Sequence, residues 1–199
     1  MLKNSGEMGR GVYHMFLAMD ESDEIEIKFT SSSTASGRTP TKMTLGGWLW
    51  AKDPNPYSTA VFAHEFTHMV QASGDPHGNF SVASELEARI VEYYIKVELG
   101  HELSTSDKKI FELYDKNPDI SKEDLKQFRN DYLLNGNLWW PENLGTSLAW
   151  MVYRFEPLTQ GVGDFVLIQT FKLMGAHFSA ESTAPAVPTG RKNMDIYIR

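Results

Sequence analysis

The sequence predicts a single α+β domain, residues 1–199, in which a small N-terminal sheet precedes a mostly helical body. Its 199 residues suit one domain, and 41% hydrophobic with 23% charged residues is typical of a globular protein. No internal repeat or linker divides the chain. Alternating polar and apolar side chains occur before residue 53, whereas helical patterns dominate after it.

Two strands and a loop are predicted in the first part of the chain. Glu24 to Phe29 alternates polar and apolar side chains, as a half-buried strand does. Residues 30–41 are rich in Ser, Thr, Gly and Pro, which indicates a flexible exposed loop. Residues 43–51 (MTLGGWLWA) predict a second strand, in which Gly46 and Gly47 mark a bulge or a close backbone approach. The first third is therefore expected to hold strand and loop.

Helices are predicted after the break at residues 53–56 (DPNP). Ser58 or Thr59 can cap the first, which runs to about Ala72, and the second is expected at about Val82–Leu99. Four more are expected at about 104–118, at 121–134 behind a capping box of Ser121 and Asp124, at 146–155 and at 164–174, and the tail from 179 to 190 is expected to be irregular.

Composition excludes several classes of partner. The formal net charge is −7 and no strong basic cluster is visible, so no nucleic acid is expected as a partner. The absence of cysteine excludes disulfides, Cys-ligated zinc and thiol nucleophiles. No stretch approaches the ~20 apolar residues of a membrane span. The first ten residues lack a signal-peptide core, so the protein is expected to be cytoplasmic, or leaderless and exported as part of a larger protein. The oligomeric state stays open.

The chemistry is concentrated at residues 64–68, which read His-Glu-Phe-Thr-His. On an α-helix His64 and His68 lie one turn apart on the same face, close enough to bind one metal ion. Glu65 points about 100° around the helix, so it cannot join them, but it can reach a water on the metal. Zinc lowers the pKa of such a water toward about 7, and Glu65 can take its proton as it attacks a carbonyl. The pattern predicts two zinc ligands and a general base.

The surroundings of the motif favour this interpretation over a structural role for the histidines. The helix is strongly apolar, with Val61, Phe62, Phe66, Met69 and Val70. Such a helix is expected to be buried, and two buried histidines and a glutamate need partners, which a metal ion supplies. A chain of this composition would contain the motif by chance about once in a hundred cases.

A catalytic zinc site has three protein ligands and an open position for water, and the next predicted helix offers Glu85 and Glu87. With these residues the chain resembles the gluzincins, the zincin metallopeptidases whose third ligand is a glutamate on the following helix. In such families a small residue follows that glutamate three positions later. Glu85 followed by Ala88 fits the pattern, and Glu87 followed by Ile90 does not. The resemblance therefore makes Glu85 the expected ligand and Glu87 the alternative.

Arg89 departs from the family pattern, because many gluzincins carry an acidic residue there that supports a ligand histidine. Support for a histidine's second nitrogen must then come from Glu92 or from a backbone carbonyl. A solvated helix face is the other explanation of these side chains, since Glu85 with Arg89 and Glu92 with Lys96 are i,i+4 pairs that need no metal. If Glu85 is the ligand, Glu87 is expected to be a solvated carboxylate.

The resemblance, which covers residues 59–92, implies a zincin-like fold, bound Zn²⁺ and a peptide or protein substrate hydrolysed by a zinc metalloendopeptidase. The strand at 43–51 would be an edge strand that binds extended peptide by β-addition. The stretch HEFTHMVQ also faintly resembles metallopeptidase domains of bacterial polymorphic toxins, which suggests a toxin or effector. The alternatives are a zinc hydrolase of a non-peptide amide and a catalytically inert zincin-shaped binding module. The intact Glu65 argues against the inert module.

Some further residues are candidates for lesser roles. Trp48 and Trp50 share one strand face and Trp139-Trp140-Pro141 could line a cleft, although aromatic clusters usually belong to the core. Residues that could stabilise a transition-state oxyanion, each with an ordinary structural explanation as well, are His14, His77, His101, His177, Tyr93 and Tyr153.

Overall fold

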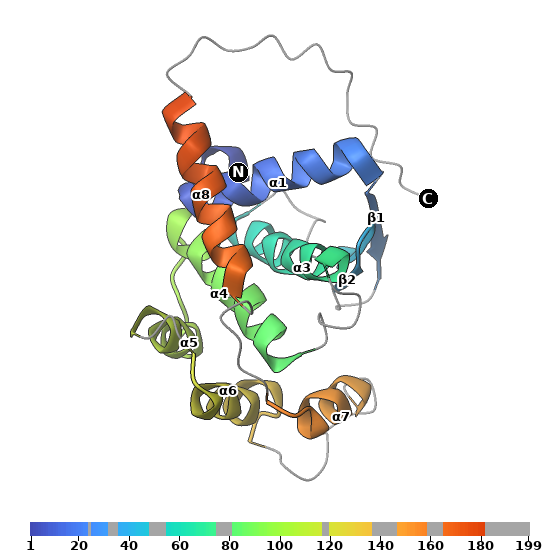
Figure 1. The fold of residues 1–199 in the computed structure, drawn as a ribbon, viewed down its shortest axis with the longest axis vertical. Helices are drawn as coiled ribbons and strands as arrows, with labels where there is room; N and C mark the ends of the chain where they lie inside the picture. Colours follow the sequence, from blue (N-terminus) through green and yellow to red (C-terminus); the bar gives the residue numbers. More distant parts are fainter. Residues whose placement is uncertain are drawn as a thin grey trace.

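The computed structural model describes residues 1–23, 25–31, 36–47, 55–74, 81–116, 120–136, 147–158 and 165–181. Within these residues the chain is mostly helical with a small sheet (Figure 1), which agrees with an α+β class in the coarse sense. The elements in chain order are η1 (Leu2–Asn4), α1 (Glu7–Asp23), β1 (Glu26–Thr30), β2 (Ser36–Thr39), β3 (Lys42–Gly46), α3 (Pro56–Gly74), α4 (Val82–Glu98), α5 (Thr105–Lys116), α6 (Lys122–Phe128), the π-helix η3 (Arg129–Leu133), α7 (Ser147–Phe155) and α8 (Val166–Glu181).

Helix α1 corrects the prediction that the first third of the chain holds only strand and loop. Its glycines are poor helix formers, which obscures the pattern, and tertiary contacts stabilise it instead. Met8 and Val12 are buried in the core. The carboxylate of Glu98 in α4 accepts hydrogen bonds from the Met8 and Gly9 amides at 2.8 and 2.9 Å. A residue distant in the sequence therefore caps the N-terminus of α1.

Helices α1 and α8 cross at very close range (Figure 1). A Cβ atom at Gly11 would collide with the Phe171 carbonyl, and one at Gly175 would collide with the Glu7 carbonyl. Backbone therefore packs directly against backbone at this crossing, which requires glycine at both positions. Helix α8 continues to Glu181, past its predicted end and into the segment predicted to be an irregular tail.

The sheet has the strand order β1-β3-β2, with β1 parallel and β2 antiparallel to β3. Strand β3 is thus the middle strand, which corrects the prediction that it forms an edge. Among the described strands, the edge strand next to α3 is β2, within the segment predicted to be a loop. Gly47 makes the predicted close backbone approach, because a Cβ there would lie 3.0 Å from the Thr30 carbonyl oxygen. Trp48 and Trp50 lie outside the described residues.

Helix α3 occupies the centre of the molecule (Figure 1), and its Ala60, Ala63, Phe66 and Met69 are fully buried, as its apolar sequence predicts. It begins at Pro56 and not at Ser58 or Thr59, and it runs to Gly74. Asn55 caps it, since the Asn55 Oδ1 accepts a hydrogen bond from the Ser58 amide at 2.9 Å. A proline in the first turn fits a helix start.

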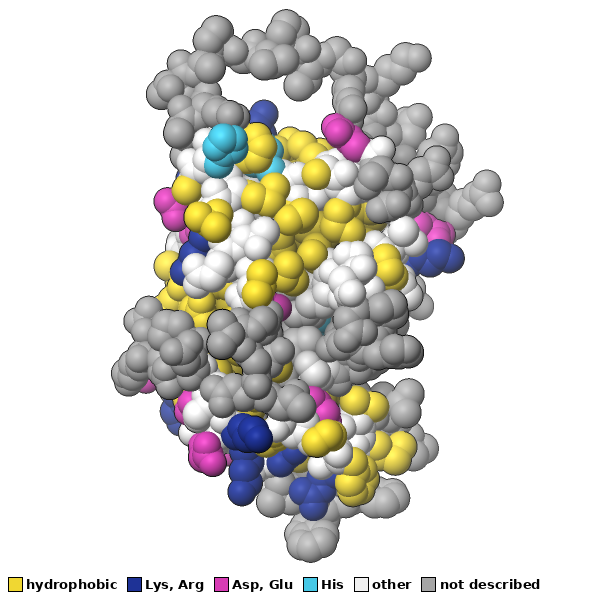
Figure 2. All heavy atoms as spheres, in the orientation of Figure 1, with side chains coloured by type: hydrophobic (Ala, Val, Ile, Leu, Met, Phe, Trp, Pro, Cys, Tyr) yellow, Lys and Arg dark blue, Asp and Glu magenta, His cyan; other side chains and the backbone are white. Residues whose placement is uncertain are grey.

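The later helices lie close to their predicted positions. Helix α4 begins with a capping box of Ser81 and Ser84, and α6 begins with the predicted capping box of Ser121 and Asp124. No described helix has the length and apolar character needed to cross a bilayer. Hydrophobic side chains gather on the surface over α7 (Figure 2), where Phe155 is 77% exposed.

Candidate metal centre

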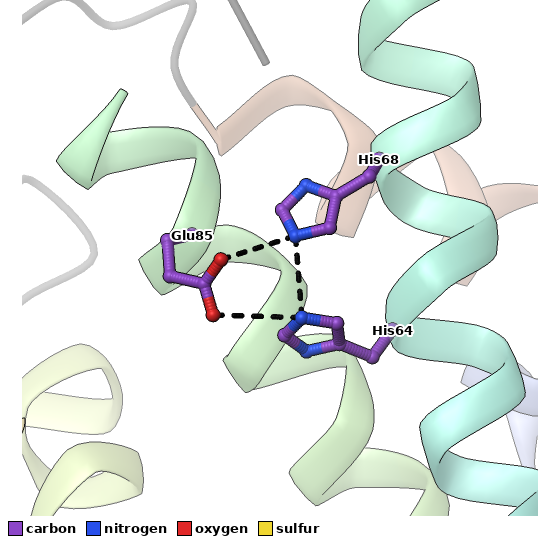
Figure 3. A group of neighbouring side chains, drawn as sticks. All are labelled: His64, His68 and Glu85. Carbon is purple, nitrogen blue, oxygen red and sulfur yellow. Dashed lines mark hydrogen bonds and ion pairs between the residues drawn. The ribbon is translucent and has the colours of Figure 1, made fainter. Parts of the chain in front are cut away.

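Helices α3 and α4 bring together the side chains of His64, His68 and Glu85, and all three are buried (Figure 3). The two Nε2 atoms of the histidines are 3.2 Å apart. The Nε2 of His68 lies 3.1 Å from Glu85 Oε2, and that of His64 lies 3.5 Å from Glu85 Oε1. The two imidazoles from one face of α3 therefore converge on a carboxylate from α4, as the sequence predicts, and this group could hold a metal ion.

The spacing of these donor atoms matches that of ligands around one small cation. Donors bound at about 2.0–2.1 Å to a tetrahedral ion lie about 3.3–3.4 Å apart. Here the two imidazole nitrogens are 3.2 Å apart, and they lie 3.1 and 3.5 Å from different oxygens of the Glu85 carboxylate. Two imidazole nitrogens and a carboxylate that share one space repel one another when all three present lone pairs. A cation between them converts that repulsion into attraction.

Glu92 supports His64 from the side opposite the cluster. Its Oε2 lies 3.1 Å from the Nδ1 of His64, although the ring N–H is poorly aligned with it. Lys96 Nζ lies 2.8 Å from the other oxygen of Glu92. Arg89 bridges the ligand and its support, with Nε 3.3 Å from Glu85 and an Nη 3.2 Å from Glu92. Arg89, the residue that departs from the gluzincin pattern, thus forms ion pairs with both carboxylates.

His68 is supported through an amide. Its Nδ1 lies 2.8 Å from the Oε1 of Gln71. The Gln71 amide nitrogen donates to the Ser84 carbonyl at 3.0 Å and to the Glu87 carboxylate at 2.8 Å. The other oxygen of Glu87 accepts from the Leu167 amide at 3.0 Å. Glu87 is only 2% exposed, so the prediction of a solvated carboxylate is wrong. Glu87 lies behind His68 and not in the cluster.

The carboxylates of the cluster are held in their charged form. Burial raises the pKa of Glu85, but His64, His68 and Arg89 lower it more, so its pKa is well below the usual range. Burial likewise raises the pKa of Glu92, and its interaction with His64 and the charges of Arg89 and Lys96 outweigh that effect. Burial lowers the pKa of His64, whereas Glu85 and Glu92 raise it, and the net direction is upward.

The charged residues around the cluster carry a net negative charge, which is compatible with a bound divalent cation. Two cations, Arg89 and Lys96, are opposed by four buried carboxylates, those of Glu65, Glu85, Glu87 and Glu92. Asp107 adds a further carboxylate 3.4 Å from Lys96, so negative charge exceeds positive charge among these residues, and a bound cation would offset part of the excess. Buried carboxylates without compensation are costly, so the donor set and its surroundings both fit a bound dication.

Glu65 is 8% exposed and follows directly after His64 in α3. Within the described part of the chain its carboxylate has no hydrogen-bond or ion-pair partner, in contrast to the other three buried glutamates. It is close enough to raise the pKa of His64 by its charge. A carboxylate with unused acceptor capacity therefore lies beside the cluster.

Tyr153 of α7 also reaches the cluster, since its hydroxyl lies 3.3 Å from Glu85 Oε2 and the residue is buried.

The other candidates for oxyanion stabilisation lie elsewhere or make other contacts. His14 stacks on Phe178 of α8, and Tyr93 lies beneath the Lys96 ammonium group. The remaining described candidates contact other aromatic rings, His101 that of Tyr57 and His177 that of Phe178. His77 and the segment Trp139-Trp140-Pro141 lie outside the described residues.

Known proteins give no further guide to this site. The chain matches no protein-family model, and neither a curated protein nor a solved structure is significantly similar to it. The assignment of function therefore depends on the geometry and chemistry of the cluster.

Proposed function

We propose that this protein is a zinc-dependent metallopeptidase in which His64, His68 and Glu85 bind the metal and Glu65 is the general base. The observation that carries the proposal is the convergence of two imidazole Nε2 atoms and a carboxylate, all buried and 3.1–3.5 Å apart. A buried carboxylate with no other partner among the described residues, Glu65, follows the first of these histidines.

The donor set favours zinc over other divalent ions. Mg²⁺ and Ca²⁺ prefer oxygen ligands at six or more positions, whereas zinc accepts two imidazoles and one carboxylate in tetrahedral geometry. Three protein ligands leave the fourth position open, which is characteristic of catalytic and not structural zinc sites. A zinc ion bound there would polarise a substrate carbonyl and lower the pKa of water.

The chain's own residues then account for the proton transfers. Glu65 takes the proton from the attacking water and delivers it to the leaving amine. The hydroxyl of Tyr153, which donates to Glu85 Oε2 in this structure, would redirect its hydrogen bond to the oxyanion of the tetrahedral intermediate. Glu92 and Gln71 keep the two imidazoles oriented throughout.

The arrangement of elements supports a zincin-like fold. The ligands come from consecutive helices, α3 and α4, and Ala88, three residues after Glu85, is fully buried. Edge strand β2, which lies against α3, takes the role that the sequence predicts for residues 43–51. An edge strand offers free backbone groups to an extended peptide, so β2 is the proposed site of substrate binding by β-addition.

Metal analysis combined with digestion of a peptide library tests the proposal. Wild-type protein should hold about one zinc per chain and cleave peptides, and an excess of chelator should abolish cleavage. Glu65→Gln should keep the zinc while cleavage falls about 10²–10⁴-fold, because proton transfer is lost but coordination is not. Full zinc occupancy without cleavage in the wild type would favour an inert binding module, and loss of zinc in Glu65→Gln would make Glu65 a ligand.

A further inference from the structure

His68 can bind a metal through Nε2 only if its proton resides on Nδ1. We propose that Gln71 and Glu87 are positioning residues that select this tautomer of His68, and that Glu87 connects the selection to the N-terminus of α8. The inference rests on the metal centre proposed above. It assigns a role to a buried carboxylate that the catalytic mechanism does not use.

The first step is the orientation of the Gln71 amide. Its nitrogen lies 3.0 Å from the Ser84 carbonyl oxygen and 2.8 Å from the Glu87 carboxylate. Both of these groups accept hydrogen bonds and neither can donate one. The NH₂ end of the amide must therefore face α4, and its oxygen must face the other way.

The second step follows at His68. The Gln71 Oε1 lies 2.8 Å from the ring Nδ1, and an amide oxygen only accepts hydrogen bonds. The Nδ1 must then carry a hydrogen, so a neutral ring has its lone pair on Nε2, the atom that faces His64 and Glu85. In metal-free protein Glu85 opposes this preference, because its carboxylate can accept a hydrogen from Nε2. If the amide turned over, its NH₂ would donate to Nδ1, the ring proton would move to Nε2, and the metal site would be blocked.

The third step makes Glu87 the residue that prevents this reversal. It is 2% exposed, and each of its oxygens has its own donor, the Gln71 amide and the Leu167 amide at the start of α8. The positive end of the α8 dipole favours a carboxylate at this position. A glutamine there would accept from Leu167 with its oxygen, so its NH₂ group would face Gln71 and favour the oxygen end of that amide, while the Ser84 carbonyl would still favour the NH₂ end.

Competition between the protein and a chromophoric zinc chelator measures the consequence. Glu87→Gln should weaken zinc binding about tenfold to a hundredfold, as is usual when an outer partner of a ligand histidine is lost. Glu102→Gln, which alters an exposed carboxylate just after α4, is the matched control and should bind zinc as the wild type does. Gln71→Met removes both amide groups without a change of charge and should also weaken binding.

The ¹⁵N chemical shifts of the His68 ring report the tautomer directly in metal-free protein, at a pH where the ring is neutral. The share of the tautomer with its hydrogen on Nδ1 should be larger in the wild type than in Glu87→Gln, with Glu85 competing for the hydrogen at Nε2 equally in both. Adding Gln71→Glu to Glu87→Gln should restore the larger share of the Nδ1–H tautomer, because a carboxylate at position 71 only accepts from His68 and the new amide at position 87 can donate to it. The Ser84 carbonyl loses its donor, so zinc affinity should recover only in part. A merely structural role for Glu87 predicts no such recovery.

Wild-type zinc affinity in both single variants, or an unchanged tautomer in Glu87→Gln, would overturn the inference and leave the metal centre intact. A wild-type protein that binds no zinc would instead refute the metal centre itself. The two failures are therefore distinguishable without any measurement of peptidase activity.

Discussion

Replacement of Glu92 by glutamine tests whether the buried charged residues next to His64 contribute both to the stability of the protein and to its affinity for zinc. Glu92 is 3% exposed and contacts three positively charged or donor groups, those of His64, Arg89 and Lys96. Lys96 is itself 5% exposed and lies between the rings of Tyr57 and Tyr93, so it depends on a nearby carboxylate. Glutamine keeps the shape of Glu92 and removes its charge.

The magnitude follows from the partners that remain. Removing one member of a buried ion pair typically costs about 3–5 kcal/mol. Here Lys96 keeps Asp107 at 3.4 Å and Arg89 keeps Glu85 at 3.3 Å. We therefore expect the free energy of unfolding of metal-free protein to fall by about 2–3 kcal/mol, below the usual range. Zinc affinity should fall about tenfold, at the lower end for an outer partner, because an amide oxygen can still accept from His64.

Urea denaturation of metal-free protein measures the first quantity and competition with a chelator measures the second. Lys96→Met separates the two effects, because it also removes a buried charge but leaves Glu92 in contact with His64 and Arg89. It should therefore lower stability with a smaller effect on zinc affinity. An unfolding free energy of Glu92→Gln within about 0.5 kcal/mol of the wild type, the range of a surface substitution, would refute the reasoning.

Further outcomes are expected for the ligands, for the pH dependence and for the helix crossing. Zinc content should fall from about one per chain to near zero in His64→Ala and in His68→Ala, because each removes one of three ligands. Atomic absorption measures the zinc content, and an equal value in the wild type and both variants would contradict this. The pKa of His64 is raised in the fold, so its contribution to the stability of metal-free protein is complete below about pH 6.5 and is lost as the pH rises through the folded pKa. Stabilisation by zinc, which needs the neutral ring, should grow with pH in thermal melts. Gly11→Ala should destabilise the protein by about 1–3 kcal/mol although alanine is the better helix former, because its Cβ meets the backbone of α8; Gly74→Ala, with open space around it, should not.

The sequence predicts the part of the site that depends on local geometry. His64 and His68 share a face because of helical periodicity alone, and the apolar residues around them already indicate a buried helix. The choice between Glu85 and Glu87 has no such local basis, since both lie on α4 and both are buried. Only the family spacing with Ala88 favoured Glu85, and the packing of α4 on α3 places it at the histidines.

The parts that the sequence did not predict depend on contacts between distant segments. Helix α1 contains glycines that a propensity argument penalises, yet those glycines allow its close crossing with α8 and its N-terminus is capped by Glu98. Strand pairing is equally non-local: β3 became the middle strand because β1 and β2 pair on its two sides. Neither partner could be assigned from the alternation within a single strand.

Glu87 shows why a residue's role in such a site follows from its partners and not from its place in a motif. Judged by sequence it was either a ligand or a solvated carboxylate, and it is neither. Its two oxygens take one donor from α3 and one from the start of α8. We propose that, together with the Ser84 carbonyl, it determines the orientation of the Gln71 amide, and that this orientation favours one tautomer of His68. In the proposal, a buried acceptor thus influences the tautomer of His68, a candidate metal ligand, through two successive hydrogen bonds.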